Sequence, residues 1–411
     1  MHDLGLAPVR GHGECRAPTS NSYAPAEPRA VRLRQLAWLF LKLGTIAFGG
    51  PGAHIAMMED EVVRRRKWMT REKFLDLLGA TNLIPGPNST EMAIHIGYLR
   101  AGWSGLLVAG TCFILPAALI VSGIAWAYVR FGTLPQALAV LYGIKPVIIA
   151  VVVQALWGLG KAAVKTRFLG FVAAGALAAS LLGVNEIAVL FTGGIVVALE
   201  RWGMQRRHAG VSAFMPLLGT AAATAPAAAG VTFGLWPLFL VFLKTGSVLF
   251  GSGYVLLAFL RADLVERLGW LTEAQLLDAV AVGQMTPGPL FTTATFIGYV
   301  LAGGIGALTA TVGIFLPAFF FVALSGPLVP RIRRSRTAAA VLDGVNVASL
   351  ALMAAVTVSL ARAAIVDVPT AILALLAAVL LLRFRINSAW LVLGGGGAGI
   401  ASAYLLGRAA S

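Results

Sequence analysis

The sequence predicts an all-α polytopic membrane protein. We expect two homologous halves arranged as an inverted-topology repeat, with broken or re-entrant helices and about 10 to 13 membrane segments in total. The first reason is composition: 58% of the residues are hydrophobic and 12% are charged, with a mean hydropathy of +0.85, whereas about 25% of residues are charged in a typical soluble domain. The second is an internal repeat, and the third is the distribution of Lys and Arg among short loops.

One segment of the chain occurs twice, as an internal repeat. Residues 40–87 align without gaps with residues 242–289, and 16 of the 48 positions are identical. The shared features are a lysine, a glycine-rich break and a Pro-Gly-Pro triplet. After one inserted residue, the match resumes at an offset of 201, pairing Gly97 with Gly298. Duplicated membrane units with interrupted helices are typical of secondary transporters.

The repeat also suggests domain boundaries. Residues 1–34 are polar and have no apolar run of the kind found in signal peptides, so we expect a disordered cytoplasmic tail. The first repeat unit then covers 35–208 and the second 233–411. The stretch between them, 209–232, is free of charge and long enough for a linking transmembrane segment. Thirteen apolar runs occur in all, and several are short or interrupted by Gly and Pro.

Basic loops occupy different repeat positions in the two halves. The loop from Lys161 to Arg167 aligns with the single Arg362, while the loop from Arg331 to Arg336 aligns with residues 130–135, which carry one arginine. Because Lys and Arg mark cytoplasmic loops, this alternation indicates opposite insertion of the halves. It also requires residues 35–73 to begin and end on the cytoplasmic side, as a re-entrant or broken element. A parallel duplication with ordinary spans is the alternative.

Each Pro-Gly-Pro triplet is predicted to interrupt a helix inside the membrane. Proline removes backbone donors, and the second proline suits the first position of a new helix. The amides that follow, at Asn88 to Thr90 and at Leu290 to Thr292, would be free at a helix start. In an inverted repeat the two starts would face each other and form a donor-rich pocket suited to an anion. A packing kink is the alternative.

Two lysines recur inside apolar segments. Lys42 and Lys244 each lie seven residues before a glycine break, at Gly49 and Gly251. A lysine near the bilayer centre costs about 2.5 to 3.5 kcal/mol, so a binding role is the functional reading and snorkelling to the interface is the alternative. Lys145 is a third candidate, and its repeat partner is Asn346.

The candidate residues fall into two groups. Those predicted to bind substrate are Lys42, Gly49, Gly50, Pro51, Pro85, Gly86, Pro87, Asn88, Ser89, Lys145, Lys244, Gly251, Ser252, Pro287, Gly288, Pro289 and Thr292. Those considered for proton coupling are Glu91, His95 and Asp343. The repeated Asp76 and Asp278 follow a Trp and a Thr, and we interpret them as structural parts of an amphipathic interfacial helix.

Other function classes find little support. We find no HExxH motif, no paired Asp-rich motif and no Ser/His/Asp set, so we expect neither an enzyme nor a metal or cofactor. Cys15 and Cys112 are too few for a zinc site. The net charge of +15 lies in short loops, which argues against nucleic-acid binding. A passive anion channel is the alternative that is harder to distinguish from a transporter.

The repeated motifs resemble one known family. An FGGPG segment, a charged stretch ending in W-x-T-x-x-x-F/L-x-D, and Pro-Gly-Pro together resemble the long, two-domain form of the chromate ion transporter family, over about residues 35–130 and 237–331. The family's motif residues correspond to Gly49, Gly50, Pro51, Pro85, Gly86, Pro87, Gly251, Pro287, Gly288 and Pro289. The second copy reads FGSG instead of FGGPG, which suggests that the halves are specialised.

The resemblance implies a function. We expect a multi-pass protein of the bacterial inner membrane, with a cytoplasmic N-terminus, that exports chromate, is driven by the proton-motive force and confers chromate resistance. Its repeat units would be two chromate transporter repeats. A transporter or channel for sulfate or another inorganic oxyanion is the alternative. The expected partners are a chromate- or sulfate-like oxyanion and the lipid bilayer, with a homodimer as an option.

Overall fold

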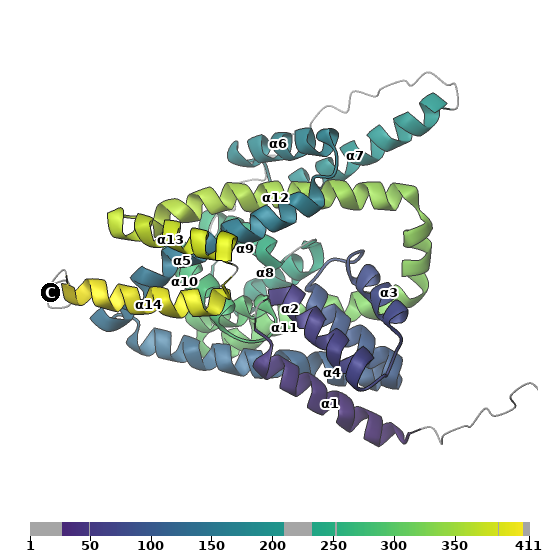
Figure 1. The fold of residues 1–411 in the computed structure, drawn as a ribbon, viewed down its shortest axis with the longest axis horizontal. Coiled ribbons are helices and arrows are strands. Elements are labelled where there is room, and N and C mark those ends of the chain that lie inside the picture. Colours follow the sequence, from purple (N-terminus) through teal and green to yellow (C-terminus); the bar gives the residue numbers. More distant parts are fainter. Residues whose placement is uncertain (1–26, 49, 209–231, 251–252, 385, 406–411) are drawn as a thin grey trace, which may run out of the picture.

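The computed structural model describes residues 27–48, 50–208, 232–250, 253–384 and 386–405, and every regular element in these ranges is a helix (Figure 1). The predicted all-α class is therefore confirmed. The predicted linking segment, 209–232, lies almost entirely outside the described residues. Residues 1–26 of the predicted tail, 1–34, also lie outside them.

The first half opens with two re-entrant hairpins. The chain descends in α1, breaks, and returns through α2 into a π-helical stretch, η1. It descends again in α3, passes Pro-Gly-Pro and returns in the first part of α4. Three further helices complete the half. The bounds are α1 Arg29–Ile46, α2 Gly50–Glu59, η1 Asp60–Arg65, α3 Arg71–Thr81, α4 Asn88–Phe131, α5 Pro135–Ala163, α6 Arg167–Leu181 and α7 Glu186–His208.

The second half repeats this order, including the π-helical stretch, and adds two short 3₁₀ turns, η2 and η4. Its elements are α8 Leu235–Val248, η2 Gly253–Val255, α9 Leu256–Leu260, η3 Arg261–Arg267, α10 Glu273–Met285, η4 Leu290–Thr292, α11 Thr293–Arg334, α12 Arg336–Ala364, α13 Val368–Phe384 and α14 Ser388–Leu405. Helices α3 and α10 are both capped at their starts by a threonine hydroxyl, of Thr70 and Thr272.

The helices α4 and α11 are themselves hairpins. Each reverses at an Ala-Gly pair whose glycine has positive φ, Gly102 at 65° and Gly303 at 61°. The two arms touch through glycines: a Cβ built on Gly97 would lie 2.2 Å from the carbonyl oxygen of Gly105. Close backbone contact of this kind requires residues without a side chain. The longer arm of each hairpin then crosses the whole molecule.

The loop ends gather on two opposite faces. On the first, which we call the basic face, the start of α1, the α4 reversal and the start of α3 meet: Arg32 donates to the carbonyl of Arg100 at 2.9 Å, and the Arg100 guanidinium lies 4.9 Å from the Trp68 ring. The α5–α6 loop, the last turns of α7 and the start of α12 lie on this face too, joined by Lys165, Arg201 and Asp343.

On the other face, which we call the opposite face, the α4–α5 region of the first half contacts the start of α10 and the α12–α13 loop of the second half. Tyr128, near the end of α4, donates to Asp278 in the second turn of α10 at 2.9 Å. Tyr142, in the second turn of α5, donates to Asp367 in the α12–α13 loop at 2.6–2.7 Å. The second half thus begins on the face opposite the one where the first begins, which is the predicted inverted repeat.

The two halves are built into each other. Helix α5 of the first half packs against α13 and α14 of the second, and α12 of the second packs against α6 and α7 of the first, while α4 packs against α11 (Figure 1). Five helical stretches in the described ranges are long and apolar enough to cross a membrane: Asn88–Phe131, Pro135–Ala163, Glu186–Met204, Leu290–Ser325 and Thr337–Ala364. Shorter apolar helices in the described ranges are Arg167–Leu181, Leu235–Val248 and Val368–Phe384.

Candidate functional site

The two Pro-Gly-Pro triplets are held by the helix breaks of the opposite halves. The amide of Gly86 donates to the carbonyl of Leu249, just past α8, at 2.8 Å, and the amide of Gly288 donates to the carbonyl of Ala47, just past α1, at 2.9 Å. These four positions are related by the repeat offset of 202, so the contact is reciprocal. All four broken ends therefore meet near the centre, as the inverted repeat predicts.

The two helix starts after the triplets differ. Helix α4 begins directly at Asn88, while the second half begins with the 3₁₀ turn η4, Leu290–Thr292. The second half is one residue shorter here. Because a 3₁₀ turn rises about 2.0 Å per residue and an α-helix about 1.5 Å, three residues of the former span the length of four of the latter. The 3₁₀ turn therefore compensates for the missing residue.

A cavity of about 580 Å³ lies against these broken ends. Its lining includes Pro51, Asn82, Asn88, Ser89, Leu290 and Phe291. A second cavity of about 320 Å³ shares Asn82, Asn88 and Leu159 with the first and extends to Lys165 and Asp343 on the basic face. Together they form one space, the central cavity, that runs from the first Pro-Gly-Pro triplet to the basic face and is lined by apolar and polar residues.

The first half supplies most of the polar groups in this cavity. The amides of Thr90 and Glu91 donate to the carbonyl of Pro87. The amides of Asn88 and Ser89, which line the cavity, have no acceptor among the described residues. The Asn88 side chain is held by Asn82, with 2.8 Å between amide nitrogen and oxygen. A helix start with open amides and neutral side-chain donors is suited to an anion.

At its helix start the second half contributes apolar side chains instead. Leu290 and Phe291 occupy the positions of Asn88 and Ser89, and the hydroxyl of the buried Thr292 donates to Pro289 within its own turn at 2.8 Å. The prediction placed two facing helix starts at one cavity, and both starts reach it. The amides of Leu290 and Phe291, like those of Asn88 and Ser89, have no acceptor among the described residues, but only the first start adds polar side chains. The buried Ser349 hydroxyl, which has no partner among the described residues, also lines this space.

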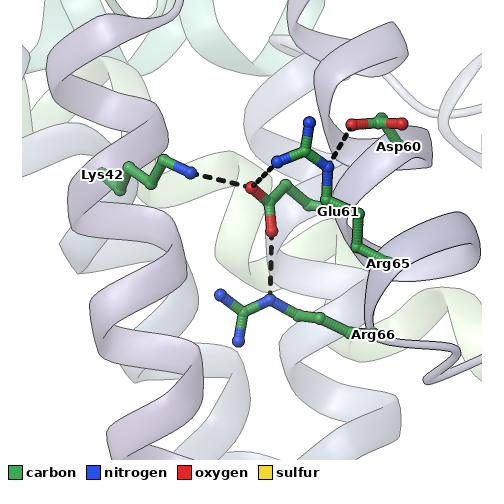
Figure 2. Close-up of polar contacts among 5 residues, drawn as sticks. All are labelled: Lys42, Asp60, Glu61, Arg65 and Arg66. Carbon is green, nitrogen blue, oxygen red and sulfur yellow. Dashed lines mark hydrogen bonds and ion pairs between the residues drawn. The ribbon is translucent and has the colours of Figure 1, made fainter.

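Lys42 and Lys244 each form an ion pair with an acidic residue of the π-helical stretch in the same half. The Lys42 ammonium lies 2.8 Å from Glu61, which also contacts Arg65 and Arg66 (Figure 2). Lys244 pairs with Asp263, which also contacts Arg267 at 3.0 Å. Glu61 and Asp263 are buried and stand at the same repeat position. We did not predict these carboxylates, although the aligned Glu and Asp indicate them in the sequence.

Lys145 is paired across the two halves. Its ammonium lies 3.1 Å from Asp278 of α10, whose other oxygen accepts from Tyr128. The interpretation of Asp278 as part of an interfacial helix is wrong: Leu276 to Val282 are buried, and Asp278 is 3% exposed. An amphipathic pattern is visible only in the copy at α3, where Asp76 is exposed.

The three residues considered for proton coupling lie in different surroundings. Glu91 is fully buried one turn into α4, and neither carboxyl oxygen has a partner among the described residues. It faces Gly86, where an added Cβ would lie 2.4 Å from Oε1. His95 is buried, 3.5 Å from the Ser325 hydroxyl. Asp343 lies instead on the basic face, 3.2 Å from Lys165 and 2.5 Å from Arg201.

Only some of the remaining predicted residues line the central cavity. Pro51 and Pro87 line the cavity. Gly50 starts α2 with φ of 77°, while Pro85, Pro287 and Pro289 flank the two central glycines. Gly49, Gly251 and Ser252 lie outside the described residues. Lys42, Lys145 and Lys244 are not brought together in one pocket, since each is held by its own carboxylate.

Comparison with known proteins points in one direction. A family model described as Chromate transporter matches residues 34–198 and 236–400. The chain is 36% identical over 364 residues to the "Chromate transport protein" of Cupriavidus metallidurans, covering 86% of this chain and 88% of the relative. It is 34% identical over 356 residues to the "Chromate transport protein" of Pseudomonas aeruginosa, covering 84% and 85%. A "Probable chromate transport protein" of Synechococcus elongatus is 31% identical over 357 residues, covering 85% and 89%. No solved structure matches the chain.

Proposed function

The chain belongs to the chromate transporter family, and from this premise we propose that it exports chromate across the bacterial inner membrane and so confers chromate resistance. The observation that carries the proposal is the central cavity, in which the open amides of Asn88 and Ser89 lie at a broken helix start. A tetrahedral dianion bound there would accept from these amides and from the side chains of Asn82 and Asn88. Sulfate has the same shape and charge and would use the same donors.

The proposed orientation rests on the loop charges. Arginines and lysines gather at helix ends on the basic face, and only a few lie near the opposite face. Those on the basic face are Arg29, Arg32, Arg34, Arg64, Arg65, Arg66, Lys67, Arg100, Lys161, Lys165, Arg167, Arg201, Arg331, Arg333, Arg334 and Arg336. By the positive-inside rule this face, with the N-terminus, is cytoplasmic. The central cavity then extends toward the cytoplasm, where an exporter must collect its substrate.

The membrane potential supports export as the direction. Moving one elementary charge through 100 mV is worth about 2.3 kcal/mol. A dianion that leaves a negatively charged cytoplasm therefore gains about 4.6 kcal/mol per 100 mV, twice the single-charge value. The electrical part of the proton-motive force can thus drive export, with or without a proton in exchange.

The charged candidates have supporting roles in this proposal. Lys42 and Lys244 flank the two breaks and add positive potential, although each is partly neutralised by its carboxylate. Glu91 and His95 are buried titratable groups of the α4 arm that follows the first triplet, and we keep them as proton-coupling candidates. Asp343 with Lys165 and Arg201 would meet the anion at the cytoplasmic mouth. A homodimer stays a prediction.

Chromate uptake into inside-out vesicles tests the proposal. These vesicles expose the cytoplasmic face, so export appears as uptake. We expect uptake to rise when the vesicle interior is made positive with a potassium gradient and valinomycin, and sulfate to compete. A pH gradient imposed at zero potential then measures any proton coupling separately.

Vesicles from cells without the protein are the control. If the protein gave no chromate or sulfate flux under either gradient, the proposed function would be wrong. Flux that persisted without saturation as chromate rose would instead favour the channel alternative.

A further inference from the structure

The two re-entrant hairpins of the inverted repeat are packed differently. Helix α10 packs against α5, α12 and α14, and its residues Leu276 to Val282 are all buried. Its counterpart α3 packs against α4 and α11, and Asp76 and Leu75 of α3 are exposed. In Figure 1, α3 lies at the edge of the helix bundle. The hairpin of the second half is therefore closed onto the long helices, and that of the first half is open.

The closed hairpin is fastened by one buried cluster. Lys145 comes from α5 of the first half and Asp278 from α10 of the second, with 3.1 Å between Nζ and Oδ1. Tyr128, from the end of α4, donates to Oδ2 at 2.9 Å and packs edge-on against Phe296 of α11, with ring centroids 5.1 Å apart. These are the charged and titratable groups that the structure places against Asp278.

The sequence of the other half does not keep the two partners of Asp278 at the corresponding positions. The position of Asp278 is kept as Asp76, but the position of Lys145 is taken by Asn346 and that of Tyr128 by Val329. Asn346 lines the central cavity, on the side that extends to the basic face. The Lys145–Asp278–Tyr128 cluster thus lies toward the opposite face. At the repeat-related place toward the basic face, the central cavity is found instead.

We propose that Asp278 is a positioning residue for transport, which through Lys145 and Tyr128 holds α10 closed and so seals the opposite face while the central cavity extends to the basic face. The proposal rests on the proposed function, because a seal has a role only if the cavity must open alternately to the two sides. Opening α10 would expose the second Pro-Gly-Pro triplet, nine residues beyond Asp278, from the opposite face.

The physical reason is the cost of a buried unpaired charge. Separating Lys145 from Asp278 inside the protein leaves both without compensation, which is strongly unfavourable. The closed state is thus favoured until both groups find new partners. Removing either charge lowers this preference, and the apparent affinity for chromate on the basic face falls in proportion to the fraction of molecules still closed.

Cysteine accessibility tests the proposal. In a background with Cys15→Ser and Cys112→Ala, a single cysteine replaces Ala281, which is 1% exposed and lies one turn beyond Asp278. A membrane-impermeant maleimide is applied to spheroplasts, where it reaches the face opposite the cytoplasm. We expect slow labelling with the cluster intact and roughly tenfold faster labelling in Asp278→Asn and Lys145→Gln.

Three variants complete the test. Asp76→Asn, at the matching position of the open hairpin, is the control and should leave labelling slow. Lys145→Arg keeps the charge and should also stay slow. Tyr128→Phe removes one hydrogen bond and should give an intermediate rate, and it serves as the test if the charge variants do not reach the membrane.

The outcomes separate this inference from the proposed function. If the protein with an intact cluster transports chromate, but Asp278→Asn, Lys145→Gln and Tyr128→Phe all label slowly, α10 is not held by this cluster and the inference is overturned. Equally fast labelling in Lys145→Arg would also overturn it, because the charge would then not matter. If the unaltered protein moves no oxyanion in vesicles, the proposed function fails, whatever the labelling shows.

Discussion

The amide of Gly86 donates a 2.8 Å hydrogen bond to the carbonyl of Leu249, and the repeat generates the same bond, at 2.9 Å, between Gly288 and Ala47. Each Pro-Gly-Pro triplet is thereby tied to the break in the other half. Backbone groups inside a membrane must find partners within the protein. The reciprocal bonds satisfy groups that both breaks would otherwise leave open, and they couple the two halves at the centre.

The two central glycines should tolerate substitution differently. A Cβ on Gly288 would lie 2.5 Å from the Cβ of Ala117, which cannot move without its helix, whereas a Cβ on Gly86 would meet the flexible end of Glu91. Both also have positive φ, 88° and 134°. We expect Gly288→Ala to lower the melting temperature in detergent clearly more than Gly86→Ala, with backbone strain costing about 1–3 kcal/mol in each.

Gly303→Ala is the control for backbone strain alone, because φ there is 61° and nothing lies within 4 Å of an added Cβ. A Gly288→Ala variant no less stable than this control would show that Ala117 can shift aside.

The duplicated lysine–carboxylate pairs should behave as coupled units. Removing Lys42 leaves Glu61 with Arg65 and Arg66, while removing Glu61 leaves a lysine without its partner. We expect a double-mutant cycle of Lys42→Gln and Glu61→Gln, measured by thermal unfolding in detergent, to give a coupling of about 0.5–3 kcal/mol. The Lys244 and Asp263 cycle is the matched comparison, and additive effects in both would mean that the pairs contribute no stability.

Much of the architecture follows from the sequence because it depends on repeated local features. The Pro-Gly-Pro triplets break helices wherever they occur, and the loop charges fix the relative direction of the halves. The same local signals predicted that the segment after Phe40 is re-entrant, and the structure confirms this by bringing the ends of residues 35–73 to one face. The inverted repeat could therefore be predicted without knowledge of tertiary contacts.

The unpredicted features depend on pairing across the halves. Asp278 looks interfacial within its own helix, and only the packing of α5 against α10 shows that Lys145 neutralises it. Free amides were predicted at both triplets, but the side chains of Leu290 and Phe291 make the second start less polar than the first. The difference between a closed α10 and an open α3 is a property of the conformation that the structure shows. An alignment of the two repeats cannot predict it.

The first helix start should bind substrate more strongly than the second. Hydrogen bonds to a charged group contribute about 1.5–3 kcal/mol, so we expect Asn88→Ala to raise the KM for chromate in inside-out vesicles by about tenfold or more. Leu290→Ala, at the equivalent position, is the matched control and should change the KM little. Equal effects in the two variants would contradict the assignment of the polar donors to the first half.

The last prediction concerns Glu91 and the pH dependence of uptake. Glu91 is fully buried with no partner among the described residues, beside Gly86 and one turn from the amides of Asn88 and Ser89. An ionised carboxylate there would be poorly solvated and would repel a dianion in the cavity. Bound anion and a protonated Glu91 should therefore favour each other.

We expect uptake to fall as the pH on the cytoplasmic face rises. Glu91→Gln, which mimics the neutral carboxyl, should keep uptake at low pH and flatten its decline at high pH. His95→Gln, at the other buried titratable group of this arm, is the comparison. Initial rates in inside-out vesicles at fixed membrane potential provide the measurement, and an unchanged decline in Glu91→Gln would exclude this carboxyl as its cause.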